Sequence, residues 1–247
     1  MDVKGIQIAK TGGPSVMKWK TITVGKPKKG QVTVRHTAIG FNFIDINHRT
    51  GRYPLEMPTG IGSEAAGVVE AVGAGVKDLK VGQRVVYVGA VGTYSEAQNV
   101  SADICVPIPR DISDEIAAAT HLKGMTVEML VERVGKVKKG DVVMMHSASG
   151  GVGLLLCQWA KSRGAIVIGT ASSAAKCKEI LKAGAKHAID TSKKDVVKEV
   201  AKITKGAGVD VIFDPVGKDT YEISLGCLKD RGLLASFGGA SGPVPHV

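Results

Sequence analysis

Hydrophobic and polar positions follow two different rhythms along the chain. In the first half, short runs alternate with a period of two and are broken by glycine, as in residues 31–36 and 81–88. Residues 64–73 form a third run of this kind, with a turn at its end. Such alternation is typical of strands with one buried face. We therefore expect residues 1–122 to form an antiparallel, partly barrel-like β domain.

From about Leu122-Lys123-Gly124 onward, apolar segments alternate with amphipathic ones. Apolar side chains in 151–163 recur at positions that share one face of a helix. The pattern predicts strands over 141–146, 165–169, 186–189, 209–214 and 232–237, and helices over 151–163, 173–183, 193–204 and 219–229. Strands that alternate with helices in this way indicate a parallel sheet covered by helices on both faces.

A glycine-rich turn lies between the first of these strands and the helix that follows it. Ala148, Gly150 and Gly153 occupy the three small positions of a GxGxxG-like spacing. The middle position allows the backbone to approach a pyrophosphate, and the last allows the helix to pack closely on the strand. The helix N-terminus then offers N–H groups and partial positive charge to phosphates. The turn predicts a dinucleotide site; the alternative is an ordinary tight strand-to-helix turn.

The end of the next predicted strand bears on the choice of dinucleotide. NAD-binding proteins usually place Asp or Glu there, whereas residues 169–176 contain no carboxylate. Thr170 and Ser172 offer hydroxyl groups, and Lys176 lies within reach on the following helix. One charge-assisted hydrogen bond contributes about 1.5–3 kcal/mol, which is roughly a 10- to 100-fold preference for NADPH. The alternative is that Lys176 is only a solvated helix residue.

Composition and charge limit the classes of partner. The chain carries 33 basic and 23 acidic residues, a net charge of +10, with the larger excess in the second half. This charge favours an anionic ligand and would also attract nucleic acid. The few aromatic residues of that half lie outside its lysine clusters, so we expect no nucleic-acid partner. The chain has no apolar run of the roughly 20 residues that span a bilayer, and its N-terminus does not resemble a signal peptide. We expect a cytoplasmic protein without a membrane partner.

The stretch from Gly140 through the glycine-rich turn to Lys161 resembles the signature of NADPH:quinone oxidoreductases. These are the ζ-crystallin-like, zinc-free branch of the medium-chain dehydrogenase/reductases. Met144, where the signature usually has Leu, is the one departure. Supporting similarities occur at residues 12–14, 40–45, 51–54, 122–126 and 236–238, so the resemblance covers essentially the whole chain.

The resemblance implies a fold that combines α/β and β architecture. Residues 1–122 would form a GroES-like substrate domain, and residues 123–247 a Rossmann-type, doubly wound NADPH-binding domain. Relatives continue beyond this point to add a last strand and return to the substrate domain. By this comparison the Rossmann domain is incomplete and stops before its last strand. The resemblance also implies a homodimer for the full-length form.

Site residues also follow from the resemblance. Asn42 and Tyr53 would flank the nicotinamide and the acceptor, although Asn42 could serve only a turn and Tyr53 only packing. The cofactor would contact two residues of the interdomain cleft, the start of the helix after the glycine-rich turn, and the end of the last predicted strand. These residues are Lys123, Thr126, Gly151, Val152, Phe237 and Gly238.

No metal is expected at the site. Zinc-dependent relatives carry Cys and His near positions that are Asn42 and Ser63 here, so the donors of a tetrahedral site are missing. None of the six histidines is assigned to catalysis. Without a Lewis acid, a readily reduced acceptor is favoured, and a quinone fits this requirement. The alternatives are reduction of an activated double bond in an enone or alkenal, or a non-enzymatic role as an RNA-binding or structural relative.

Overall fold

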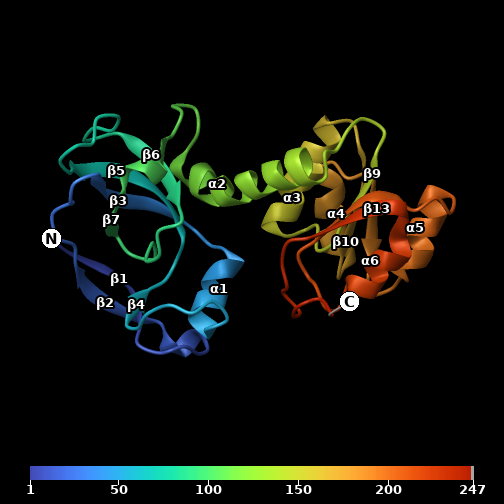
Figure 1. The fold of residues 1–247 in the computed structure, drawn as a ribbon, viewed down its shortest axis with the longest axis horizontal. Helices are drawn as coiled ribbons and strands as arrows, with labels where there is room; N and C mark the ends of the chain where they lie inside the picture. Colours follow the sequence, from blue (N-terminus) through green and yellow to red (C-terminus); the bar gives the residue numbers. More distant parts are fainter. Residues whose placement is uncertain (246–247) are drawn as a thin grey trace. The chain divides into compact units, whose positions relative to one another are not determined.

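The computed structural model describes residues 1–245. The chain separates into two compact units, Met1–Leu122 and Lys123–Val247. Helix α2 (Asp114–Glu128) contains the residues at which one unit ends and the next begins. Figure 1 shows the first unit as mostly strands and the second as strands alternating with helices.

The first unit is built from two antiparallel sheets. One has the strand order β2-β1-β4 and the other the order β7-β3-β5-β6-β8. Helix α1 follows β3. The elements are β1 (Asp2–Ile8), β2 (Lys18–Thr23), β3 (Gln31–Gly40), α1 (Phe43–Thr50), β4 (Thr59–Gly60), β5 (Glu64–Val72), β6 (Arg84–Val88), β7 (Ala97–Ser101) and β8 (Cys105–Pro107).

Alternation along the strands produces the core of the first unit. Val32 and Val34 of β3, Val69 of β5 and Val85 of β6 are fully buried, as is the ring of Tyr87. Successive side chains of a strand point to opposite faces, so a period of two places one set of residues inside. The antiparallel β domain predicted from the sequence is therefore confirmed.

The second unit contains one five-stranded parallel sheet with the order β11-β10-β9-β12-β13. Its first two strands, β9 and β10, lie side by side, and β12 pairs with the other edge of β9. The elements are a π-helical turn η3 (Met129–Val134), β9 (Val142–Met145), α3 (Gly151–Ser162), β10 (Ile166–Ala171), α4 (Ala174–Lys182), β11 (His187–Asp190), α5 (Val196–Thr204), β12 (Val209–Asp214), α6 (Tyr221–Cys227) and β13 (Leu228–Ser236).

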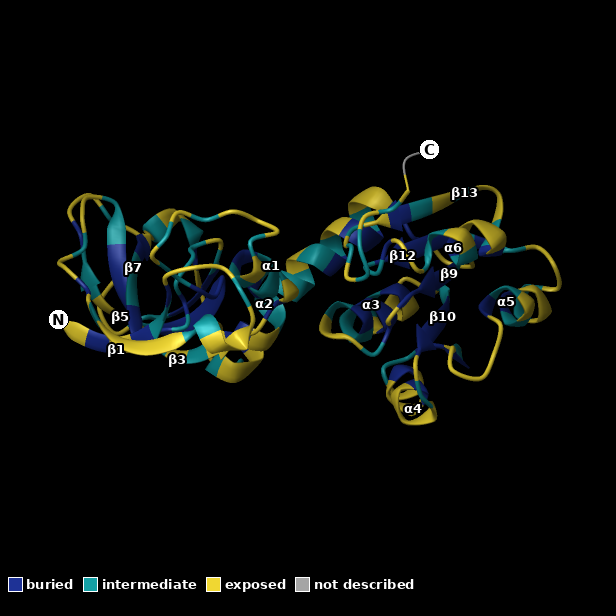
Figure 2. Ribbon diagram, turned by 90° about the horizontal axis from the view of Figure 1, so that it is seen from below, coloured by how far each residue is buried: buried dark blue, intermediate teal, exposed yellow. Residues whose placement is uncertain are grey.

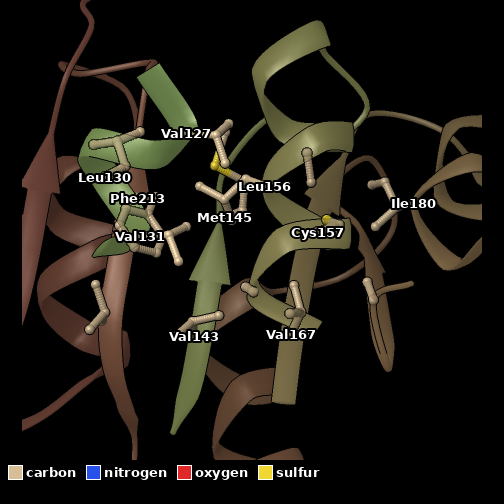
Figure 3. Close-up of a cluster of buried hydrophobic side chains, with 14 of the residues drawn as sticks. Val127, Leu130, Val131, Val143, Met145, Leu156, Cys157, Val167, Ile180 and Phe213 are labelled. Atoms are coloured by element: carbon tan, nitrogen blue, oxygen red, sulfur yellow. The ribbon is translucent and has the colours of Figure 1, made fainter. Parts of the chain in front are cut away.

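Helices cover both faces of this sheet, so its strands are buried on both sides. Val143 and Met145 pack with Leu156 of α3 on one face, and Figure 3 shows these side chains gathered between β9 and α3. Met144 packs on the other face with residues of α5 and α6. Figure 2 shows the resulting layers, with dark blue strands between helices whose outer surfaces are yellow. The doubly wound α/β fold predicted for the second half of the chain is confirmed.

Some predicted boundaries were wrong. The helix predicted over 193–204 begins only at Val196, because Asp195 caps it by accepting a hydrogen bond from the Lys198 N–H. The helix predicted to reach residue 229 ends at Cys227, and the last strand starts at Leu228 instead of residue 232. A register shift opposite Val209 absorbs the irregular start of that strand. Helices α1 and α2 were not predicted.

None of the helices within residues 1–245 is long and apolar enough to cross a membrane.

Candidate functional site

A pocket of about 600 Å³ lies at the carboxyl-terminal edge of the parallel sheet. It is lined by residues that follow four neighbouring strands: Ser147 after β9, Ser172 after β10, Thr191 and Lys194 after β11, and Val216 after β12. In open parallel sheets, ligands bind outside the carboxyl ends of the strands, where the chain order reverses direction. Here that reversal occurs at β9, because β10 and β12 flank it on opposite sides.

The glycine-rich turn joins β9 to α3 beside this pocket. Ser147 has a left-handed backbone with φ of 52°, and the N–H of Ala148 donates to the carbonyl oxygen of Thr170 at 2.9 Å. Gly150 is the N-cap residue of α3, with φ of −74° and ψ of 169°. Because Gly150 has no side chain to cap the helix, the first N–H groups of α3 remain open to an anion.

The glycines of this turn have different steric roles. A Cβ atom on Gly153 would lie 2.5 Å from both the Cα atom and the carbonyl oxygen of Ala148, so only glycine fits between α3 and the turn. A Cβ atom on Gly150 would have the Ser147 carbonyl oxygen as its nearest neighbour, at 3.3 Å. Bulk at Gly153 therefore collides with the protein, whereas bulk at Gly150 extends into the space in front of the helix.

The predicted 2′-phosphate residues lie at the end of β10. Thr170 is buried and Ser172 is exposed, and both line the pocket. Lys176, in the first turn of α4, is exposed, and its Nζ atom donates to the Ser172 hydroxyl at 3.3 Å. Lys194 also lines the pocket, from the loop after β11, and the sequence analysis missed it. Its position after the third parallel strand is the signal that could have identified it.

His146 is buried at the base of the same pocket. Its ring lies between two hydroxyl groups, with Nδ1 3.3 Å from Oγ1 of Thr170 and Nε2 3.0 Å from Oγ of Ser224. Burial lowers the pKa of His146, and the opposing charge of Asp214 does not compensate for it. The imidazole is therefore neutral near neutral pH, and it ties β9 to the end of β10 and to α6.

In the first unit, Asn42 lies at the N-terminus of α1 and is almost fully buried. Its side-chain Nδ2 donates to Oε2 of Glu64 at 2.8 Å, while Oε1 of Glu64 accepts from the Leu122 N–H at 2.6 Å. Glu64 is completely buried. A Cβ atom on Gly40 would approach this carboxylate to 2.2 Å, so glycine makes room for it. The carboxylate holds the Asn42 amide in one orientation.

Asp45 forms a second buried polar group beside Asn42. Its carboxylate accepts hydrogen bonds from the Asn42 N–H at 3.0 Å, from the Ser63 hydroxyl at 2.6 Å and from the Tyr94 hydroxyl at 2.9 Å. Burial raises the pKa of Tyr94, and the neighbouring Asp45 charge raises it further, so Tyr94 keeps its proton as a donor. Asp45 is thus engaged in fixing the start of α1.

Tyr53 lies in the segment after α1. Its side chain is about half exposed, at 46%, and its ring meets the His48 ring edge-on at a centroid distance of 6.2 Å. Phe41, next to Asn42, is 67% exposed and lines an apolar pocket of about 250 Å³ together with Ile61 and Tyr94. Asn42 and Tyr53 therefore flank one helix, with exposed aromatic rings beside it.

The remaining predicted cofactor residues all lie in the second unit. A Cβ atom on Gly151 would meet the Cδ and Cε atoms of Lys123 at 2.8 Å, so the lysine side chain lies over the glycine-rich turn. Thr126 and Val152 are half-buried, on α2 and α3 respectively. Phe237 and Gly238 follow β13. The Phe237 N–H donates to the Asp214 carbonyl oxygen at 3.0 Å, which holds this segment beside the loop after β12 and outside the pocket lining.

Within residues 1–245, no three His, Cys, Asp or Glu side chains converge in a way that could hold a metal ion. The four cysteines, all buried, are free thiols. Ser63 stands where zinc-dependent relatives were expected to carry histidine, and its hydroxyl is directed to Asp45.

Family models match both units. Residues 28–110 match the alcohol dehydrogenase GroES-like domain, and residues 151–246 match the zinc-binding dehydrogenase domain. Among curated relatives, a quinone oxidoreductase of Salmonella typhimurium is 48% identical over 98% of this chain and 75% of its own length. A 2-haloacrylate reductase of a Burkholderia species is 45% identical over 97% of this chain and 74% of its own length.

Solved structures give the same result. The structure of Escherichia coli quinone oxidoreductase complexed with NADPH is 46% identical and superposes with a TM-score of 0.96. The matched region includes 99% of this chain and 76% of the E. coli chain. Identity at this level over both units confirms the resemblance drawn from the glycine-rich turn. The chain belongs to the quinone oxidoreductase family of the medium-chain dehydrogenase/reductases.

Proposed function

We propose that this chain is an NADPH-dependent quinone reductase that works without a metal ion. The observation that carries the proposal is the pocket at the carboxyl edge of the parallel sheet, which opens beside a glycine-rich turn and a helix N-terminus. The complex of the E. coli relative with NADPH and the names of the closely similar relatives support it.

The residues of the second unit fit a dinucleotide with a 2′-phosphate. Gly150 leaves room for a pyrophosphate in front of α3, where helix N–H groups favour negative charge. Ser172 and Lys176 offer a hydroxyl and a cation at the end of β10, and residues 169–176 hold no carboxylate that would repel a phosphate. Lys123, lying over Gly151, adds positive charge on the same side.

The chemistry required of the protein is modest. A bound nicotinamide supplies a hydride, which carries two electrons and one proton. Reduction of a quinone to its hydroquinone needs one further proton, which water can deliver. The protein's share is therefore orientation and exclusion of water from the reacting atoms. We assign contact with the acceptor to Asn42, whose amide is held by Glu64, and to the exposed phenol of Tyr53.

A quinone is preferred over an activated alkene as the acceptor. Addition of hydride to an enone leaves a carbanion that must be protonated at carbon, and a positioned acid accelerates that step. Of the two residues assigned to acceptor contact, Tyr53 is the one with a hydroxyl group, so it is the candidate proton donor for alkene reduction. If alkene reduction were the main reaction, Tyr53→Phe would lower turnover strongly, whereas quinone reduction would depend on it only for positioning.

An acceptor screen tests the proposal. The purified chain is mixed with NADPH and either a benzoquinone, a naphthoquinone, an enone or a 2-haloacrylate, and loss of NADPH absorbance is followed. We expect the quinones to be reduced fastest and Asn42→Ala to lower kcat/KM by about 10- to 100-fold, because orienting contacts are worth a few kcal/mol. Faster turnover of the alkenes, or no turnover of any acceptor by a chain that binds NADPH, would contradict it.

A further inference from the structure

Two lysines approach the nucleotide pocket from different loops. Lys176 reaches it from α4 through its hydrogen bond to Ser172. Lys194 lines it directly, from the loop after β11. Both lysines therefore lie near the ends of β10 and β11, one through its bond to the pocket residue Ser172 and one as a pocket residue itself.

The loop that carries Lys194 is fastened to the end of β10. Both the N–H and the hydroxyl of Thr191 donate to the Ala171 carbonyl oxygen, at 2.8 and 3.2 Å. The Lys194 N–H donates to the Asp190 carbonyl oxygen at 3.0 Å, and Asp190 in turn accepts from Ser192. The backbone of Lys194 is thus fixed next to the strand end that carries Ser172, although its side chain is 52% exposed.

The carboxylate that pairs with Lys194 is already shared with a second lysine. Its Nζ atom lies 3.0 Å from Oε2 of Glu199, which also pairs with Lys202 at 2.8 Å. These lysines lower the pKa of Glu199, mainly through the hydrogen bond from Lys202. Asp195 lines the pocket as well, but its carboxylate caps α5 at the Lys198 N–H. Asp219 and its neighbour Thr220 also line the pocket.

We propose that Lys194 is a second specificity-determining residue, which binds the 2′-phosphate of NADPH together with Lys176 and Ser172. The inference rests on the proposed function and deepens it, because it assigns the basis of discrimination between NADPH and NADH. Glu199 retains Lys202 when Lys194 turns to the phosphate, so no carboxylate is left unpaired by the exchange. A phosphate monoester carries close to two negative charges near neutral pH and accepts hydrogen bonds from two cations at once.

Equilibrium binding tests the proposal without turnover. The dissociation constants of NADPH and NADH are measured by ligand fluorescence for the wild type, Lys194→Met, Lys176→Met and the double variant. Lys193→Met is the matched control, since Lys193 neighbours Lys194 on the same loop and does not line the pocket. Methionine keeps most of the length of the lysine side chain and removes its charge. Unfolding midpoints verify that each variant is folded.

The expected loss is moderate because Lys194 is half exposed. Lys194→Met and Lys176→Met should each weaken NADPH by about 5-fold, and the double variant by about 25-fold, with NADH unchanged. Lys193→Met should change NADPH binding by less than about 2-fold. Glu199→Gln should tighten NADPH, because it releases Lys194 from its ion pair in the free protein.

The outcomes separate this inference from the proposed function. If Lys194→Met leaves the NADPH to NADH ratio unchanged, or if Lys193→Met lowers it equally, the assignment of Lys194 is overturned while dinucleotide binding stands. Equal affinity of the wild type for NADPH and NADH also overturns it. If the wild type binds neither dinucleotide, the proposed function fails and this inference fails with it.

Discussion

Replacement of Gly153 by alanine should destabilise the second unit. A Cβ atom there would lie 2.5 Å from the Cα atom of Ala148, so the two segments must separate by about 0.9 Å to restore an ordinary contact of 3.4 Å. The packing around Ala148 prevents this residue from moving away from α3. It is completely buried, its N–H is bonded to Thr170, and a Cβ atom on Gly169 would already lie 2.9 Å from the Ala148 side chain.

The magnitude follows from two opposing effects. Overpacking of this kind costs about 1–3 kcal/mol, whereas alanine gains up to about 1 kcal/mol over glycine in a helix interior. We expect a net loss of about 1–2 kcal/mol in the free energy of unfolding. Gly151→Ala is the matched control on the same helix, because its Cβ would meet only the flexible end of Lys123. That variant should be as stable as the wild type or slightly more stable.

Urea unfolding followed by the fluorescence of Trp159 measures this effect. Trp159 belongs to α3, and Trp19→Phe removes the other tryptophan of the chain, so the signal reports on the second unit. A Gly153→Ala variant as stable as the Gly151→Ala control would refute the close contact between α3 and the glycine-rich turn.

Three further predictions concern the buried polar groups and metal dependence. Glu64→Gln should lower the free energy of unfolding by about 1–3 kcal/mol, because an amide cannot accept the hydrogen bonds from both Asn42 and the Leu122 N–H on separate oxygens. A double-mutant cycle with Asn42→Ala that shows no coupling energy would refute the contact between Asn42 and Glu64. Burial lowers the pKa of His36 below its usual 6.5, so the unfolded chain takes up the proton first as the pH falls. The free energy of unfolding should therefore decrease as the pH drops below about 6.5. His36→Asn should lose less stability than the wild type between pH 7 and pH 5, and an equal loss would refute the lowered pKa of His36. Chelators should leave quinone reduction unchanged, and inhibition that added zinc reverses would contradict a metal-free mechanism.

The sequence predicts the parallel sheet well because its strands are buried on both faces. Each strand is therefore a short apolar run, and each following helix has one apolar stripe. Val209–Asp214 was predicted with its observed bounds for this reason. Helix α2 was missed because its apolar residues do not gather on one face; its buried alanines, Ala117 and Ala118, are adjacent in sequence.

The candidate site could be predicted only where one local segment contains it. Gly150 and Gly153 are three residues apart at the start of α3, so their spacing alone predicts the close approach of the helix to the glycine-rich turn. The contact between Asn42 and Glu64 joins residues 22 positions apart. Lys194 reaches the pocket from a loop that the pairing of β11 with β10 and the Thr191 hydrogen bond to Ala171 place at the end of β10. Such contacts depend on strand order and register, which the pattern of a single segment does not contain.

Binding of NADPH to the wild type and to Gly150→Val tests the central claim most directly. A Cβ atom at Gly150 would lie 3.3 Å from the Ser147 carbonyl oxygen, a tight contact that a shift of a few tenths of an ångström relieves, and no other atom lies within 4 Å. The variant should therefore stay folded, while the space in front of α3 is filled. The account predicts that the wild type binds NADPH saturably and that Gly150→Val weakens it by at least about 100-fold, the value of two or more lost phosphate contacts. A folded Gly150→Val variant that binds NADPH as tightly as the wild type would contradict the assignment of the glycine-rich turn as the phosphate site.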